Sequence, residues 1–309
     1  MDKLRAMQTF ALVAELGSFT KAAHALQLPN ASVSTLVAQL EAHLQTKLLA
    51  RTTRRLSLTD DGAAYLERTQ RLLGDVDELE AQLRGAQTRP RGRLRIDVPA
   101  AAGRHVIAPA LPEFLAKYPE ISVEIGSTDR PVDLVVEGVD CVIRGGALHD
   151  ELLVARKLGA FEVITVAAPS YLKARGTPKS PGDLTDLTSP HIAVNFFSAK
   201  TGRVFPFDFV DKKGQALSIP LPHQAAANDA DTHVALTVAG LGLAQLPRTR
   251  VLTDLLKSGA LVQILKPWSA GELPLYVMYP RNRHLSTRLR VFVDWVVALY
   301  AKKFAVQLR

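Results

Sequence analysis

Residues 10–62 read FALVAELGSFTKAAHALQLPNASVSTLVAQLEAHLQTKLLARTTRRLSLTDDG, and the spacing of apolar residues in and around this stretch predicts short helices. Apolar side chains three and four positions apart over residues 4–15 predict a first helix, which Gly17 ends. Ser18 can cap a second helix over residues 19–28, because its hydroxyl can accept a hydrogen bond from a free amide of the first turn.

A third helix is predicted after Pro29, which cannot continue the second, and Asn30 is a suitable N-cap for it. Its apolar positions recur at offsets of three and four and predict a buried face made of Val33, Leu36, Val37, Leu40 and Leu44. Its other face carries side chains able to hydrogen-bond: Ser32, Ser34, Thr35, Gln39 and His43. Two short helices joined by a tight turn, the second small and polar on one side, are typical of a helix-turn-helix.

A basic hairpin is predicted directly after the third helix. The run LLARTTRRLSL, residues 48–58, places Leu56 and Leu58 inward and gathers Arg51, Arg54 and Arg55 near the turn. A basic wing of this kind can hold the phosphates that flank a site while the preceding helix reads base edges in the major groove. Residues 1–59 therefore predict a winged helix-turn-helix domain.

A long helix is predicted from Thr59, its cap, to about residue 84, with Asp60 and Asp61 in the first turn, where carboxylates suit the helix dipole. Apolar residues along it repeat at a spacing typical of coiled coils, at Leu66, Thr69, Leu73, Val76, Leu79 and Leu83. A seam of this length predicts pairing with the same helix of a second copy, which suits reading of paired DNA half-sites. The Gly-, Pro- and Arg-rich stretch 85–95 predicts a hinge, so that residues 60–91 form a dimerisation helix and hinge.

The remaining body alternates strands and helices. Strands are predicted at 94–98, 121–125, 141–144, 161–167, 192–197, 241–246 and 275–280, and helices at 106–118, 232–240, 250–259 and 286–303. Such alternation is typical of an α/β domain with mostly parallel sheets. Because residues 92–309 are many for one sheet, we expect two α/β subdomains. We place subdomain I at about 92–163 and 268–309 and subdomain II at about 164–267, with a ligand cleft between them.

Composition and charge narrow the function classes. The 309-residue chain is 47% hydrophobic and contains one cysteine, which excludes an internal disulfide framework and a multi-cysteine metal cluster. No apolar run reaches the roughly 18–20 residues of a membrane span, and the amino end has no continuous apolar core of a secretion signal, so a cytoplasmic protein is expected. The net charge is +3 over residues 1–60 and +6 over 281–309, but −2 over 96–280. This asymmetry favours a nucleic-acid-binding module joined to a body with another task, although the basic residues of 281–309 also fit the solvated face of a final helix.

Enzyme chemistry has little support in the sequence. The Ser-x-x-Lys pattern occurs at Ser18–Lys21 and again at Ser170–Lys173, in unrelated contexts. The eight histidines form no metal-ligand pair at helical spacing. We therefore expect no catalytic residues, no metal and no cofactor.

Together these residues resemble the LysR-type transcriptional regulators over essentially the whole chain. The resemblance is carried by GSFTKAA from Gly17, Val33-Ser34, Leu40-Glu41, RTTRR from Arg51 and LTDDG from Leu58, and by the later runs 132–146 and 225–247. The sequence RTTRRLSLT, residues 51–59, resembles the same segment in a subgroup of regulators of hydroxy-acid and aromatic-acid pathways. The resemblance implies a homodimer, or a dimer of dimers, that binds double-stranded operator DNA and a small organic effector, with no membrane partner.

The resemblance also implies the DNA contacts. Asn30, Ser34, Thr35 and Gln39 would meet base edges, and Ser18, Thr20 and the wing would bind phosphates, although Ser18 serves equally well as a helix cap. The full set is Ser18, Thr20, Lys21, Asn30, Ala31, Ser32, Ser34, Thr35, Gln39, Arg51, Thr52, Thr53, Arg54 and Arg55. The chain departs from the usual family pattern at residues 29–32, where the third helix begins, and this bears on which bases are read.

The effector site is expected at strand ends and helix starts, where free amides favour anions. Arg144 ends an apolar strand beside two glycines, so its guanidinium can clamp a carboxylate; pairing with Asp129 or Asp140 is the alternative. The resemblance places effector contacts at Ala100, Ala101, Thr128, Arg144, Asn195, Phe197 and Asn228, although Asn228-Asp229 also fits a helix cap. A carboxylic acid is the expected effector. A solute-binding protein is the alternative function, which the basic winged amino end opposes.

Overall fold

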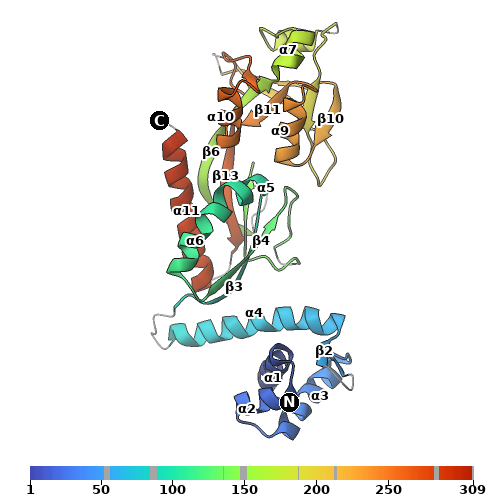
Figure 1. Cartoon of the computed structure of the whole chain (residues 1–309), viewed down its shortest axis with the longest axis vertical. Coiled ribbons are helices and arrows are strands. Elements are labelled where there is room, and N and C mark those ends of the chain that lie inside the picture. Colours follow the sequence, from blue (N-terminus) through green and yellow to red (C-terminus); the bar gives the residue numbers. More distant parts are fainter. Residues whose placement is uncertain are drawn as a thin grey trace. The chain divides into compact units, whose positions relative to one another are not determined.

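The computed structural model describes residues 1–51, 56–83, 89–134, 136–146, 152–186, 188–211, 214–281 and 285–307. It divides into two units, Met1–Arg89 and Pro90–Arg309, each of which is described by itself (Figure 1). Among the described residues, none of the helices has both the length and the apolar character that crossing a membrane requires.

Three short helices open the first unit: α1 (Lys3–Leu16), α2 (Phe19–Leu26) and α3 (Asn30–Leu44). Gly17 ends α1 with φ 59° in the left-handed region, and the Ser18 hydroxyl accepts the Lys21 amide at 3.3 Å, as the sequence predicted. The prediction that Asn30 caps α3 is wrong. Pro29 is the N-cap residue, and its carbonyl accepts the amides of the first turn. Its ring fixes the extended backbone that a helix start needs, so Asn30 becomes the first helical residue.

The core of this unit lies where α1 crosses α2 and α3. Predicted positions of the third helix, Val33, Val37 and Leu40, are buried in it, and they pack with Ala6, Phe10 and Val13 from α1 and Ala22 and Ala23 from α2. The hairpin is confirmed as β1 (Leu49–Arg51) paired antiparallel with β2 (Leu56–Leu58). Leu56 and Leu58 pack against the same core. The turn that joins the two strands lies outside the described residues.

Helix α4 (Asp60–Leu83) begins as predicted, with the Thr59 hydroxyl accepting the Gly62 amide at 2.9 Å. Its first turns fold back on the helix-turn-helix, because Leu66 packs against that core and Thr69 is 1% exposed. The start of the predicted seam therefore belongs to the chain's own domain rather than to a free dimer face. Farther along, Leu72 and Leu79 are about half exposed, at 54% and 49%.

The second unit contains a seven-stranded sheet in the order β11-β6-β13-β5-β3-β4, with β12 paired to β6. Its strands are β3 (Gly92–Val98), β4 (Ile121–Ser127), β5 (Cys141–Gly145), β6 (Leu153–Ala167), β11 (Ala244–Pro247), β12 (Val262–Gln263) and β13 (Glu272–Pro280). Only β3 pairs in parallel, with β4 and β5. The expectation of mostly parallel sheets is wrong, because the two long strands β6 and β13 run antiparallel to each other and to their other neighbours.

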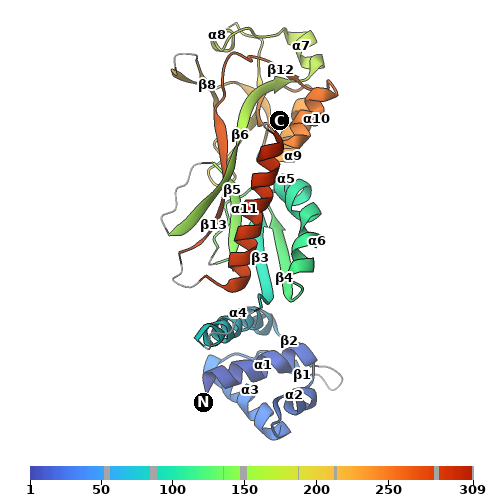
Figure 2. The same ribbon diagram turned by 90° about the vertical axis from the view of Figure 1, so that its left-hand side faces the viewer.

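Smaller elements complete this unit (Figure 2). Parallel β7 (Ala193–Phe196) and β10 (His223–Ala227) form one small sheet, and antiparallel β8 (Phe207–Val210) and β9 (Ala216–Ile219) form another. The helices are α5 (Ala100–Ala102), the π-helix η1 (Gly103–Ile107), α6 (Ala108–Lys117), α7 (Pro169–Arg175), α8 (Gly182–Thr185), α9 (Ala230–Val238), α10 (Arg250–Lys257) and α11 (Thr287–Gln307). The sequence analysis missed α5, β8, β9, β10, β12, α7 and α8, all of them seven residues long or shorter, a length at which an apolar period is ambiguous.

Four apolar clusters stabilise the described part of this unit. One joins β3, β4, β5 and β13 to α6 and α11, around Ile96, Phe114 and Phe292, and a small one is centred on Val142 of β5. Two others lie at the carboxyl end of β6, one with β7 and β8 around Phe209 and one with β11 around Leu246. The long strand β6 contributes residues to three of these clusters.

Candidate DNA interface and candidate effector site

Helix α3 presents a polar face on the side opposite its buried residues. Asn30, Ala31, Thr35 and Gln39 are exposed, and Ser32 and Ser34 are partly exposed. The predicted base-reading side chains are therefore accessible or partly accessible, although Asn30 and Gln39, nine residues apart, lie on opposite flanks of the helix at 3.6 residues per turn.

The start of α2 lies beside the start of α3. The side-chain amide of Asn30 donates to the Thr20 hydroxyl at 3.2 Å, and the Thr35 hydroxyl donates back to the Ala31 carbonyl at 2.9 Å. Ser18 uses its oxygen as a helix cap, while Lys21 is exposed. Thr52, Thr53, Arg54, Arg55 and the side chain of Arg51 lie outside what the structure describes.

Glu41, which the sequence analysis named only within the family element Leu40-Glu41, is a structural residue of this domain. It is 8% exposed, and one carboxylate oxygen accepts the Leu48 and Leu49 amides at 2.9 and 3.1 Å. The other oxygen pairs with Lys47 at 2.8 Å. Burial works against ionisation, but the hydrogen bonds from Lys47 and from the two amides prevail, so the pKa of Glu41 is lowered. The carboxylate joins the end of α3 to the wing. An acidic residue beside Leu40, on the buried side of the helix, is the feature of the sequence that could have predicted this contact.

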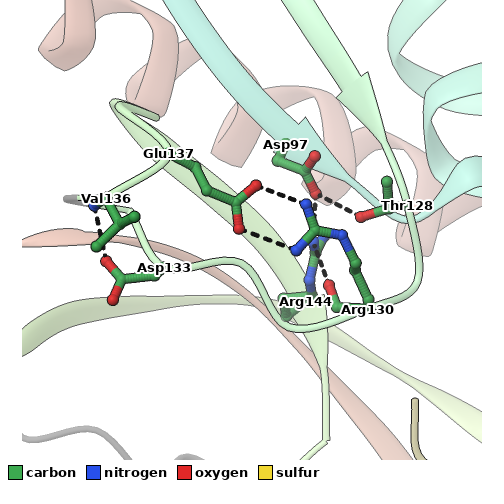
Figure 3. A network of polar contacts seen from close by, with 7 residues as sticks. All are labelled: Asp97, Thr128, Arg130, Asp133, Val136, Glu137 and Arg144. Carbon is green, nitrogen blue, oxygen red and sulfur yellow. Dashed lines mark hydrogen bonds and ion pairs between the residues drawn. The ribbon is translucent and has the colours of Figure 1, made fainter. Parts of the chain in front are cut away.

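In the second unit, Arg144 on β5 reaches across to Asp97 on β3 (Figure 3). Its guanidinium donates to an Asp97 carboxylate oxygen, to the Ile143 carbonyl at 2.8 Å and to the Arg130 carbonyl at 3.0 Å. Thr128 donates to the same Asp97 oxygen at 3.3 Å. Asp129 and Asp140, the acids considered as partners of Arg144, are not the ones that it hydrogen-bonds; Asp140 instead accepts the Arg95 amide at 2.7 Å.

The pair is enclosed. The side chains of Arg144 and Asp97 are only 15% and 8% exposed. A methyl group on Gly126 would lie 2.3 Å from the second Asp97 oxygen, so only glycine fits opposite this carboxylate. Nearer the surface, Arg130 and Glu137 form a two-pronged pair at 2.9 and 2.6 Å, and the hydrogen bonds from Arg130 lower the pKa of Glu137.

Asp129, one residue beyond Thr128, meets the start of α9. Its Oδ2 accepts the Ala230 amide at 2.8 Å. Burial raises the pKa of Asp129, while the amides of Ala230 and Ala100 lower it and the neighbouring charge of Asp229 raises it. Close by, Arg104 of η1 pairs with Asp231 of α9 at 2.5 Å. Asp229 caps α9 by accepting the Thr232 amide at 2.7 Å, which confirms the helix-cap interpretation of that residue.

The remaining predicted effector residues do not form one cluster. Ala100 and Ala101 lie in α5, after β3, and are partly buried. Asn195, 2% exposed, donates to the Leu221 carbonyl and lies 3.3 Å from a ring nitrogen of His223. With Val204, Phe205, Pro206, Ser218, Pro220 and Leu221 it lines a separate cavity of about 350 Å³. Phe197 is partly buried and Asn228 is exposed.

Sequence reasoning missed Asp97, Arg104 and Asp231 at this site. A carboxylate inside the apolar strand LRIDV was an available signal for Asp97, because a buried charge requires a partner. The pairing of Arg104 with Asp231 joins residues 127 positions apart, so no local sequence pattern predicts it. Among the described residues, no three or more His, Cys, Asp or Glu side chains gather as a metal site would require.

Comparison with known families accounts for both units. Residues 4–63 match the bacterial regulatory helix-turn-helix proteins of the lysR family, and residues 87–301 match the LysR substrate binding domain. An HTH-type transcriptional repressor of Pseudomonas aeruginosa is 42% identical over 100% of this chain and 95% of its own length. The uncharacterised HTH-type transcriptional regulator YhjC of Escherichia coli is 38% identical over 97% and 98%.

Solved structures of full-length LysR-type regulators are similar to this chain over nearly all of its length. CrgA, a LysR-type transcriptional regulator from Neisseria meningitidis, is 31% identical with a TM-score of 0.58, covering 96% of this chain and 98% of its own. Full-length AphB, a virulence activator of Vibrio cholerae, is 26% identical with a TM-score of 0.57, covering 96% and 99%. The chain therefore belongs to the LysR family of DNA-binding transcriptional regulators, with an amino-terminal helix-turn-helix and a carboxyl-terminal substrate-binding domain.

Proposed function

We propose that the chain binds its operator through the exposed face of α3 and the basic wing, in the cytoplasm where the chromosome lies. The observation that carries this proposal is the division of α3 into a buried apolar face and an exposed face of small polar side chains. Gln39 is exposed on that face and long enough to reach a base edge, where an amide can make two hydrogen bonds to adenine.

The test separates specificity from general affinity. An operator fragment selected by the full-length protein from random DNA is compared with scrambled DNA of equal length. Replacing Gln39 by Ala should narrow the gap in affinity between the two by about 1–3 kcal/mol. Replacing Arg54 and Arg55 by Ala should weaken both equally and reduce the salt dependence. An unchanged gap for the Gln39 variant would reject its role.

We propose the division into domains at residues 1–59, 60–91 and 92–309, with subdomain I over about 92–163 and 268–309 and subdomain II over about 164–267. The grouping of the apolar clusters supports the two subdomains, because the clusters around Phe114 and Val142 lie in the first and those around Phe209 and Leu246 in the second. Limited proteolysis of the full chain should cut first near residues 84–91, and primary cleavage within residues 92–163 would contradict the scheme.

We propose that α4 pairs with its copy in a homodimer, which can assemble further into a dimer of dimers. The half-exposed Leu72 and Leu79 support an apolar face beyond the part of the helix that packs on its own domain. Replacing Leu73 and Val76 by Asp should dissociate the dimer, because unpaired charges in an apolar interface cost several kcal/mol. Light scattering measures the mass, exposed Gln70→Asp is the matched control, and a fully dimeric double variant would refute the seam.

We propose that the effector is a small organic acid bound between the two subdomains, near Thr128 and Arg144. Hydrogen-bond donors gather there from several elements, namely the guanidinium of Arg144, the Thr128 hydroxyl and the amides of Ala100 and Ala230. A thermal-shift screen of the full chain with benzoate, lactate and succinate against their amides tests the charge requirement. Stabilisation by the amides alone would reject an acid effector.

A further inference from the structure

Two polar contacts join the two proposed subdomains next to the proposed effector site. The Asp129 carboxylate, in the loop after β4, accepts the Ala230 amide at the first residue of α9 at 2.8 Å. Arg104 pairs with Asp231 at 2.5 Å one residue farther along α9. Both contacts run from the part built on β3 and β4 to the part that contains β7 and β10.

These contacts place the chain's own carboxylates on the donors that an acid effector would need. The guanidinium of Arg144 already donates to Asp97 and to the carbonyls of Ile143 and Arg130. The first amide of α9 already binds Asp129. Because a carboxylic acid presents the same oxygens as an aspartate side chain, it would compete with these groups rather than fill vacant donors.

Of these internal carboxylates, Asp129 is the one most easily displaced. Asp97, on β3, is buried and has the guanidinium of Arg144 on β5 as its partner, so it is fixed. Asp129 is only half-buried and is held at its oxygen Oδ2 by a neutral amide. Burial raises the pKa of Asp129; the amides of Ala230 and Ala100 and the positive charge of Arg144 offset this only in part, and Asp229 adds repulsion. The Arg104–Asp231 pair is largely exposed, a setting in which ion pairs contribute little.

We propose that Asp129 is an internal competitor of the effector. Its carboxylate joins the two subdomains by accepting the first amide of α9, and an effector anion binds by displacing this carboxylate. This inference rests on the proposed function, an acid bound between the subdomains. It makes Asp129 a residue that sets effector affinity and links effector binding to the release of α9. An equilibrium between a self-occupied and an open state lowers the apparent affinity by the fraction that is open.

The experiment compares the full-length chain with its Asp129→Ala and Asp129→Asn variants. The matched control is Asp186→Ala, since Asp186 also accepts a backbone amide, that of Thr188 at 2.8 Å, but is the C-cap residue of α8, a helix that lies away from α5 and α9 (Figure 2). Calorimetry uses benzoate with its neutral and cationic counterparts, benzamide and benzylamine, and then lactate and succinate. Hydrogen exchange of the Ala230–His233 amides, without any ligand, measures whether α9 is released.

Removal of the competitor should tighten binding of an acid about tenfold or more in Asp129→Ala, less in Asp129→Asn and not at all in the control. The first turn of α9 should also exchange faster in Asp129→Ala without ligand. An acid that binds the wild type and Asp129→Ala equally would overturn the competitor and leave the acid effector standing. Benzylamine binding that Asp129→Ala abolishes would make Asp129 the receptor of a cation and overturn the competitor. No binding of any acid to either chain would reject the effector class and, with it, this inference.

Discussion

Removing either member of the Asp97–Arg144 pair should destabilise the substrate-binding domain severely. The two side chains are 8% and 15% exposed, so water cannot replace a lost partner. Arg144→Ala leaves the Asp97 carboxylate with the Thr128 hydroxyl at 3.3 Å and deprives two backbone carbonyls of their donor. Breaking a buried pair by removing one partner costs about 3–5 kcal/mol. The double variant Asp97→Ala/Arg144→Ala should fall short of the summed losses by about 0.5–3 kcal/mol, the coupling expected of residues in contact.

Tryptophan fluorescence during urea unfolding measures this loss selectively. The two tryptophans of the chain, Trp268 and Trp295, both lie in the unit Pro90–Arg309, so unfolding of the helix-turn-helix does not contribute. The control is Arg156→Ala, which breaks the exposed pair with Asp294 and should change the free energy of unfolding by at most about 1 kcal/mol. Additive losses in the double variant, or an Arg144→Ala loss no larger than that of the control, would refute the account of a buried, coupled pair.

Three further predictions follow from single contacts. Gly126→Ala should destabilise the same domain, because its methyl would lie 2.3 Å from an Asp97 oxygen; wild-type urea stability would contradict the close approach. Tyr300→Phe should be neutral or stabilising by about 1 kcal/mol, because the buried Tyr300 hydroxyl has no hydrogen-bond partner among the described residues. Tyr171→Phe should be destabilising, because it removes the hydroxyl that accepts the Ile192 amide at 2.9 Å. The pKa of Glu41 is lower in the folded chain than its usual value of 4.5. Glu41 therefore contributes stability that is present above pH 4.5 and is lost as the pH falls through the folded pKa. Glu41→Gln should remove this contribution to the acid unfolding of the first unit, which circular dichroism measures.

The helix-turn-helix was largely predictable, because its rules act over three or four residues. The stops at Gly17 and the caps at Ser18 and Thr59 depend on neighbouring backbone groups alone. The cap of α3 failed because two local signals competed, and the fixed backbone of Pro29 prevailed over the side chain of Asn30.

The substrate-binding domain was less predictable, because its decisive contacts connect distant residues. Six of the seven strands of the large sheet were located at least in part, β12 being the exception. The antiparallel pairing of β6 with β13, however, joins residues more than a hundred positions apart, and strand direction leaves no mark in a local apolar run. Arg144 at a strand end was singled out as a candidate effector residue, and the structure places it at the end of β5 in an ion pair. The sequence could not identify Asp97, 47 positions away, as its partner among several acids.

The long pairing of β6 with β13 restricts how the two parts of the substrate-binding domain can move. Sliding one strand by a single residue would turn its side chains to the opposite face, so the ribbon resists translation along its length but permits a tilt across its flat side. The register shifts between Leu275 and Tyr276, beside Gly159, whose φ of +153° suits no other residue and where a methyl would lie 2.3 Å from the ring of Phe304. A tilt at this point would therefore move the ring of Phe304 and the turn of α11 that carries it, so the part of the sheet beyond Gly159 cannot rotate without shifting this helix.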